Sequence, residues 1–316
     1  MRQRHRLYTW TVLLLALGFL IPIQIATVSS TLLGRESGLD WVLLDHQLAK
    51  IGTGKSPDTV FLGDSSLGNA ISAVEWERLS NGTALNLALT GSFGYEGSRN
   101  MLKRVLSWTT PRLVVIVHTA NMMQRAPAED GDRATAQGTE RFWAYARRAL
   151  TWKDALSAYY YWRTIAAGQR PVSRFDARQV IVNDYIKQRP PAAQRFLSFI
   201  NGFDEYRWES AIRPERVRIL QEISAICAAH RVLCVYAHGP LADPPCRANS
   251  YFGSVSGILR RSGLVLLSPH AMCMSLDEVG DGEDHVGPDA KIAFTRRYFD
   301  LVNQVLPRSN IGMSKP

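Results

Sequence analysis

A Gly-Asp-Ser-Ser segment is the first place where this sequence could perform chemistry. In VFLGDSSLGNAIS an apolar, strand-like run is followed by a helical pattern, so Ser65 and Ser66 fall on the turn between the two. A serine there projects from the carboxyl edge of a parallel sheet, where ligands bind. Backbone N–H groups of the turn would stabilise negative charge that develops on a substrate oxygen. The alternative interpretation is that Asp64 and the serines only cap a helix, for which both residue types are preferred.

The second candidate lies near the other end of the chain, in GDGEDHVGPDAKIAF. His285 would serve as a general base if an aspartate of the same loop held its Nδ1–H and left Nε2 free. The alternative is a solvated loop in which Asp289 caps the last helix. The sequence therefore offers a nucleophile and a base, which the fold must bring together.

Five short apolar runs are the strands expected to position these residues. They lie at 59–63, 84–89, 112–119, 232–240 and 263–269. Near-continuous apolar runs are typical of parallel strands buried on both faces. Helical patterns lie at 41–50, 95–108, 214–230, 251–262 and 290–306. This alternation predicts an α/β fold with a doubly wound, mostly parallel five-stranded sheet.

One long stretch interrupts the alternation. Residues from about 122 to 212 contain helical, aromatic-rich segments and no convincing strand. We expect a helical insertion that lies over the carboxyl edge of the sheet and shapes a substrate cleft there.

The N-terminus predicts a membrane anchor. The basic opening MRQRHR is followed by an uncharged segment from Leu7 to Val28. This segment is long enough to cross a bilayer as a helix. A cleaved signal peptide is the alternative, but Ala26-Thr27-Val28 offers no clean cleavage site. We therefore expect residues 1–30 to form a single-pass anchor, followed by a connector at 31–57. Because the basic flank stays in the cytoplasm, the remaining chain would face the other side of the membrane.

The charge distribution excludes some partners. The formal net charge is +9, but the basic residues are scattered and form no dense run with interleaved aromatics. This pattern argues against a nucleic-acid partner. The seven histidines show no metal-ligand spacing, so no metal is expected.

The four cysteines lack the paired spacing of a zinc or redox site. Cys246 and Cys273 lie in loop-like contexts and are the preferred disulfide pair in an exported domain. Cys227 lies on a predicted helix and Cys234 on the following strand, so we expect both to be buried free thiols.

Taken in order, these motifs resemble the conserved blocks of the SGNH/GDSL hydrolase superfamily. Residues 60–72 look like block I, with Ser65 at the nucleophile position. NLALTG looks like block II, where Gly91 matches the glycine whose N–H lines the oxyanion hole. VVIVHTANMM looks like block III, where Asn121 matches the asparagine that completes this hole. The segment around His285 resembles block V, which carries the catalytic histidine.

The chain departs from the family pattern at two points. The usual glycine before the block III asparagine is replaced by His118 or Thr119. The usual acid three residues before the histidine is replaced by Gly282. Asp281 is the preferred triad acid, because an extra loop residue would restore its approach to the histidine; Asp284 is its rival.

The resemblance implies a flavodoxin-like three-layer sandwich over residues 58–310, a serine acyl-enzyme and no cofactor. The anchor and GDSSLGNAI look most like exported-polysaccharide O-acetyltransferase proteins. The implied function is O-acyl transfer, most simply O-acetyl transfer, to a carbohydrate acceptor in the periplasm of a bacterium, with a multi-span membrane protein supplying the acyl group. The alternatives are a periplasmic carbohydrate esterase that uses the same triad, or a non-catalytic polysaccharide-binding or assembly protein on a degenerate SGNH fold.

Overall fold

The computed structural model describes part of the chain and divides it into two compact units. The described residues are 8–12, 14, 18, 21, 39–128, 131, 212–243, 245–247, 249–280 and 282–306. One unit comprises Met1–Asp45 and Ala136–Ser173, and the other comprises His46–Thr135 and Arg174–Pro316. All of the predicted site residues belong to the second unit.

The predicted anchor is described at only a few positions. Residues 8–12, 14, 18 and 21 are helical and exposed. Within the described residues, no helix combines the length and the apolar character needed to span a membrane. The rest of the predicted anchor, and nearly all of the insertion predicted at 122–212, lie outside the described residues.

A five-stranded parallel sheet forms the centre of the second unit, which confirms the predicted α/β class. Its strands are β1 (Thr59–Gly63), β2 (Ala84–Asn86), β3 (Leu113–His118), β4 (Leu233–His238) and β6 (Val265–Leu266). Their order is β2-β1-β3-β4-β6, and every pair is parallel. Each predicted run contains one strand. Both β1 and β3 are buried along their whole length, as continuous apolar sequence requires.

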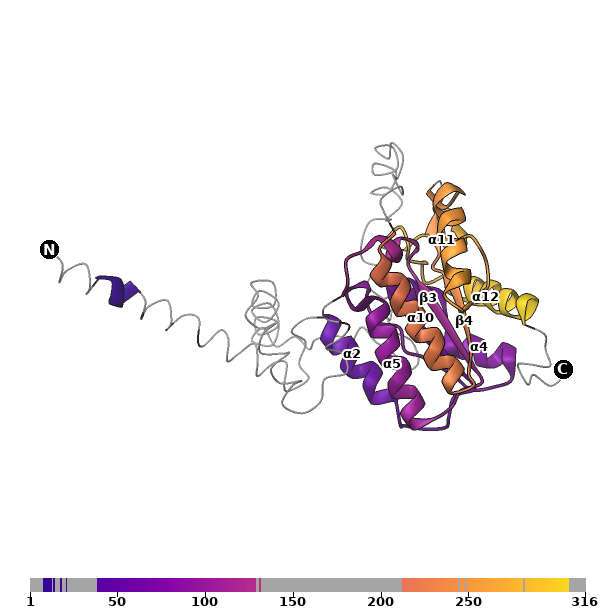
Figure 1. The fold of residues 1–316 in the computed structure, drawn as a ribbon, viewed down its shortest axis with the longest axis horizontal. Coiled ribbons are helices and arrows are strands. Elements are labelled where there is room, and N and C mark those ends of the chain that lie inside the picture. Colours follow the sequence, from indigo (N-terminus) through magenta and orange to yellow (C-terminus); the bar gives the residue numbers. More distant parts are fainter. Residues whose placement is uncertain are drawn as a thin grey trace. The chain divides into compact units, whose positions relative to one another are not determined.

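Five helices pack directly on this sheet: α3 (Ser65–Ala70), α4 (Ala73–Ser80), α5 (Gly94–Trp108), α10 (Pro214–Ala229) and α11 (Asn249–Arg261). The remaining long helices of the described residues are α2 (Leu39–Lys50), whose residues are divided between the two units, and α12 (Lys291–Val305). Helix α5 packs against α10, and α4 packs against α12. The connection from β1 to β2, which contains α4, crosses the sheet in the opposite direction to the connections that contain α5 and α10. Because such connections are right-handed, α4 and α12 lie on one face of the sheet and α5 and α10 on the other (Figure 1).

The reversal of strand order places the candidate site. Strand β2 lies on one side of β1, and the later strands β3, β4 and β6 lie on the other side. The carboxyl ends of β1 and β3 therefore flank the switch point, where such folds form a ligand crevice. Ser65 follows β1 directly, and the short helix η2 (Ala120–Gln124) follows β3. The two strands approach closely because Gly63 has no side chain; a β-carbon there would collide with the carbonyl oxygen of Val117.

A second, smaller sheet, whose first strand follows β4 in the chain, was not predicted. Strands β5 (Leu241–Ala242) and β7 (Cys273–Met274) pair in parallel. The expected disulfide between Cys246 and Cys273 joins β7 to the short helix η4 (Pro245–Arg247), which follows β5.

The expectation of free thiols at Cys227 and Cys234 is wrong, because these residues form a second disulfide. Helix α10 ends at Ala229, and Arg231 adopts a left-handed conformation with φ of 56°. The resulting tight turn brings the last turn of the helix beside the start of β4, with a Cα–Cα distance of 6.1 Å.

Candidate active site

The predicted nucleophile and the predicted base lie together. His285 Nε2 is 2.8 Å from Ser65 Oγ, although the residues are 220 positions apart in the sequence. The His285 side chain is 21% exposed, and Ser65 is also partly exposed. The pair is therefore hydrogen-bonded and accessible from solvent, as a serine nucleophile and its base must be.

The turn after β1 separates the two neighbouring serines. Asp64 caps α3, accepting from the Ser66 backbone N–H at 3.0 Å and from Ser66 Oγ at 2.6 Å. Ser66 is fully buried by this arrangement, whereas Ser65 lies on the solvent side of the same turn. The fold therefore leaves Ser65 partly accessible to solvent, whereas Ser66 is a buried hydrogen-bond donor to Asp64.

Asp64 also joins the turn after β1 to the end of β3. Its Oδ2 accepts the Thr119 backbone N–H at 2.9 Å and lies 3.4 Å from His118 Nδ1. Burial favours the neutral acid, but the contacts from His118, Ser66 and Thr119 outweigh it and lower the Asp64 pKa to about 2. The carboxylate is therefore ionised at neutral pH and holds the Ser65 turn against η2.

The loop that carries His285 is a small closed turn. Val279 and Val286 form an antiparallel bridge, and Gly280 N donates to His285 O at 2.6 Å. The turn is attached to the small sheet, because Ala242 N in β5 donates to Glu283 O at 2.7 Å. Backbone contacts on both sides thus hold the backbone of the loop that carries His285.

Helix α12 brings the two ends of the unit together. It begins shortly after His285 and packs on α3, the helix that begins at Ser65. Lys291 Nζ donates to Gly68 O at 2.8 Å, and Thr295 Oγ1 accepts the Ser72 N–H at 2.9 Å. These contacts hold the base-bearing loop over the nucleophile.

The preferred triad acid, Asp281, lies outside the described residues. Its rival Asp284 has Oδ1 at 3.5 Å from His285 Nε2, the nitrogen that also faces Ser65. An orienting acid must hold Nδ1, so this placement does not suit Asp284 to that role. Nδ1 faces the turn at residue 282, where a β-carbon on Gly282 would lie 3.3 Å away.

The two predicted oxyanion residues are linked by a third side chain. Gly91 begins the short helix η1 (Gly91–Phe93), and Asn121 lies in η2. Arg125 Nε donates to Asn121 Oδ1 at 2.9 Å. A β-carbon on Gly91 would lie 2.5 Å from Arg125 Nη1. Sequence reasoning did not identify Arg125, because its type and spacing match no catalytic pattern.

A buried ion pair supports this segment and was also missed. Glu96 and Arg216 have side chains 3% and 1% exposed, with Oε2 and Nη1 2.5 Å apart. Arg216 Nε donates to Arg125 O at 2.9 Å, and Ala128 N donates to Glu96 Oε1 at 3.2 Å. The only sequence signal was a charged residue in each of two amphipathic helical patterns, and nothing indicated that these charges would meet.

The histidines at the ends of β3 and β4 are both buried. His118 is fully buried, with Nε2 2.8 Å from Ser98 Oγ. Burial lowers the pKa of His238 to about 3, so this ring is neutral. It packs between the Tyr236 and Phe252 rings, and neither nitrogen has a hydrogen-bond partner within the described residues.

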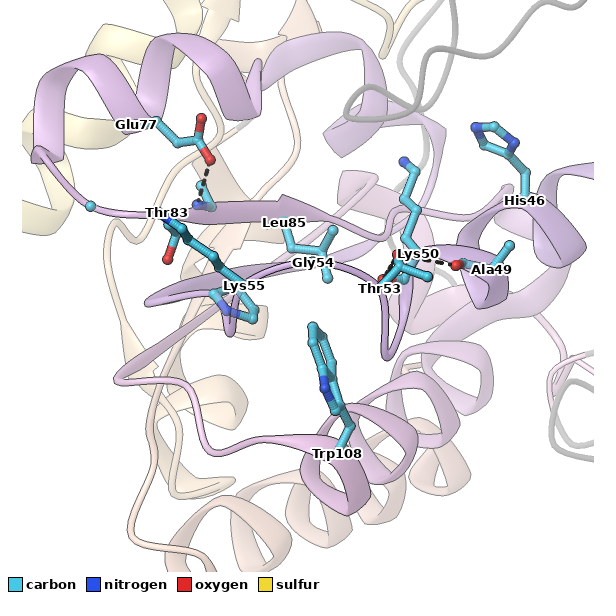
Figure 2. A pocket seen from close by; sticks show the side chains of 13 residues that line it. His46, Ala49, Lys50, Thr53, Gly54, Lys55, Glu77, Thr83, Leu85 and Trp108 are labelled. Carbon is cyan, nitrogen blue, oxygen red and sulfur yellow. Dashed lines mark hydrogen bonds between the residues drawn. The ribbon is translucent and has the colours of Figure 1, made fainter.

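A cavity of about 740 Å³ lies at the opposite edge of the sheet. Its lining comes from the end of α2, the following loop, the start of β2 and Trp108 at the end of α5 (Figure 2). It contains none of the predicted site residues. In the described part of the chain, no group of three or more His, Cys, Asp or Glu side chains is arranged to hold a metal ion.

No protein-family model matches this sequence, and no curated protein matches it significantly.

Proposed function

We propose that this chain is an SGNH-type serine acyltransferase that moves an acyl group onto an exported carbohydrate. The observation that carries the proposal is the 2.8 Å contact between His285 Nε2 and Ser65 Oγ. The strand order supports it, because numbering the five strands by their place in the chain gives 2-1-3-4-5, the flavodoxin-like order. Ser65 follows β1 directly, beside the switch point at which folds of this order bind ligands.

In the proposed reaction, His285 Nε2 accepts the Ser65 proton as Oγ attacks the carbonyl carbon of an acyl ester. The carbonyl π electrons move to oxygen and form a tetrahedral oxyanion. When this intermediate collapses, the bond to the leaving alcohol breaks, and His285 returns the proton to that alcohol. A sugar hydroxyl then repeats the sequence on the Ser65 acyl ester, giving an acylated carbohydrate and free Ser65.

The oxyanion is stabilised in this scheme by Gly91 and Asn121. The Gly91 and Ser65 backbone N–H groups and the Asn121 side-chain amide supply neutral donors. Asp64 ties the Ser65 turn to Thr119, two residues before Asn121, which supports a common location for these groups. Asp281 remains the proposed acid for His285.

The carbohydrate acceptor and the cellular location rest on the family resemblance and the N-terminus. Tyr8, Trp10 and Leu14 are 72%, 63% and 64% exposed, as residues of a lipid-facing helix would be. The two disulfides favour an oxidising compartment. We therefore propose a single-pass inner-membrane protein with its catalytic unit in the periplasm, supplied with acyl groups by a multi-span membrane protein.

The test uses the full chain in detergent with p-nitrophenyl acetate as acyl donor and a mixture of neutral and acidic oligosaccharides as acceptors. We expect nitrophenol release that depends on Ser65, and acetyl groups recovered on oligosaccharide. Ser107→Ala is the matched control, because Ser107 is an exposed serine outside the site.

Each alternative function gives a different result in this assay. Ser65-dependent release of free acetate alone would identify an esterase. An inactive wild-type chain that still binds oligosaccharide would support the non-catalytic alternative and refute the enzyme proposal.

A further inference from the structure

We propose that Arg125 is a positioning residue of this site: it fixes the Asn121 side-chain amide so that Nδ2 faces the substrate oxygen. The inference builds on the proposed function and adds a residue outside the four motifs that supply the proposed nucleophile, base and oxyanion donors. Its basis is the arrangement of Arg125, Asn121 and Gly91.

The chemistry of the guanidinium determines the orientation of the amide. Arginine has donors and no acceptor, so the 2.9 Å contact from Arg125 Nε can engage only the carbonyl end of the Asn121 amide. The NH₂ end must then face away from Arg125. This matters because the flipped amide would direct an oxygen lone pair at the oxyanion and repel it. A single hydrogen bond thus selects the orientation that stabilises the transition state.

Gly91 provides the space in which the guanidinium lies. A β-carbon at this position would be 2.5 Å from Arg125 Nη1, closer than non-bonded atoms approach. The Gly91 backbone is not in the left-handed region, so alanine can adopt its conformation. An alanine at position 91 would therefore fit only if the flexible Arg125 guanidinium moved. Gly91→Ala keeps the backbone N–H donor while displacing Arg125.

The backbone of Arg125 is fixed independently of its side chain. Arg216 Nε donates to Arg125 O at 2.9 Å, and Arg125 N donates to Met122 O at 3.3 Å. The Arg125 side chain itself is exposed, so its removal should leave the fold intact. Substitutions at this position therefore test the Asn121 contact rather than stability.

The first experiment is a double-mutant cycle on p-nitrophenyl acetate turnover by the full chain. Loss of one oxyanion donor costs about 10²–10³-fold in kcat, so we expect Arg125→Ala, which leaves Asn121 present but unoriented, to cost about 10- to 100-fold with KM nearly unchanged. Asn121→Ala should be at least as slow, and adding Arg125→Ala to it should cost nothing further. Arg125→Gln should recover much of the rate, because its amide N–H can donate to Asn121 Oδ1. Arg260→Ala, at an exposed arginine on α11, controls for the loss of charge.

The second experiment observes Asn121 directly. In side-chain amide NMR spectra of ¹⁵N-asparagine-labelled protein, we expect Arg125→Ala and Gly91→Ala to shift the Asn121 resonances, while Arg260→Ala leaves them unchanged. Additive effects in the cycle, or a rise in KM without loss of kcat, would overturn the inference. If the wild-type chain shows no Ser65-dependent turnover, the proposed function fails, and an Asn121 signal that ignores Arg125→Ala would overturn the positioning role separately.

Discussion

Ser65 and Ser66 are adjacent in the chain, yet the fold gives them opposite surroundings. Ser66 Oγ donates to the buried Asp64 carboxylate at 2.6 Å, whereas Ser65 Oγ lies 2.8 Å from His285 Nε2. The difference comes from Asp64, whose cap of α3 uses the second serine as its donor and leaves the first one accessible. Asp64 therefore has a structural role, and of the two serines only Ser65 is placed for chemistry.

The first prediction concerns this carboxylate. The pKa of Asp64 is lowered from its ordinary value of 3.8 to about 2, because contacts from His118, Ser66 and Thr119 outweigh burial. A lowered folded-state pKa stabilises the fold above pH about 4, and this contribution is lost as the pH falls from about 4 towards 2. We expect Asp64→Asn to reduce the free energy of unfolding at pH 7 by about 2 kcal/mol. Urea unfolding measured from pH 7 to pH 2 should show a shallower decline for this variant, and parallel profiles would contradict the assignment.

The second prediction concerns the triad acid. Asp284 approaches His285 Nε2 at 3.5 Å, but an orienting acid must hold Nδ1. We expect Asp281→Asn to slow acyl transfer by roughly 10²-fold, less than the loss of about 10⁴-fold in a buried triad. Asp284→Asn should stay within about 10-fold. A severe Asp284→Asn would reverse the assignment, and two mild variants would indicate a Ser65–His285 dyad. Both variants are compared with the same acyl donor.

At the scale of elements, the site is assembled by connections that are small and far apart in sequence. The β5–β7 sheet holds the His285 turn through the bond from Ala242 N to Glu283 O. Helix α12 ties that turn to α3 through Lys291 and Thr295. On the other side, the Glu96–Arg216 pair links α5 and α10 to the segment that follows η2. The central sheet places the nucleophile, and these smaller connections bring the other groups to it.

The third prediction separates the two disulfides. The Cys246–Cys273 bridge spans 27 residues and belongs to the small sheet whose strand β5 bonds to the His285 turn, whereas Cys227–Cys234 spans 7 residues and joins α10 to β4. Loop-closure entropy suggests a loss of roughly 3.5 kcal/mol for the first bridge and roughly 2 kcal/mol for the second. We expect Cys246→Ser with Cys273→Ser to lower kcat as well as the melting temperature. The matched pair Cys227→Ser with Cys234→Ser should lower only the melting temperature; equal kcat losses would show that the small sheet does not position His285.

At the scale of the whole molecule, the chain combines an uncharged N-terminal segment with a unit that contains two disulfides. The fourth prediction is that a reporter active only in the periplasm is active when fused after residue 40, and that the full chain sediments with membranes. A soluble protein whose mature N-terminus lies near residue 30 would instead indicate a cleaved signal peptide. N-terminal sequencing of the purified protein distinguishes the two.

The parts of the fold that could be predicted were those encoded in local apolar runs. The sequence located β1, β3 and β4 because buried parallel strands need continuous apolar residues, and it located Ser65 because the nucleophile turn is itself local. It missed α4, whose amphipathic pattern is short, and β5 and β7, which have two residues each.

What the sequence could not predict depends on contacts across long separations. Arg125 is four residues from Asn121, but nothing in the sequence places it over Gly91. Glu96 and Arg216 are 120 residues apart, and the Cys227–Cys234 bridge depends on the turn at Arg231. These features depend on contacts between separate elements of the fold, and no local residue pattern predicts them.

The central claim is that Ser65 carries the acyl group, and rapid-quench mass spectrometry of the full chain tests it most directly. The chain is mixed with p-nitrophenyl acetate, quenched within one turnover and digested, and fragment ions locate the acetyl group. We predict one acetyl group on Ser65 in the wild-type chain, none in Ser65→Ala, and little in His285→Ala, because the base is needed to form the ester. An acetyl group on Ser66, or steady turnover with no acylated serine at any time point, would contradict the account.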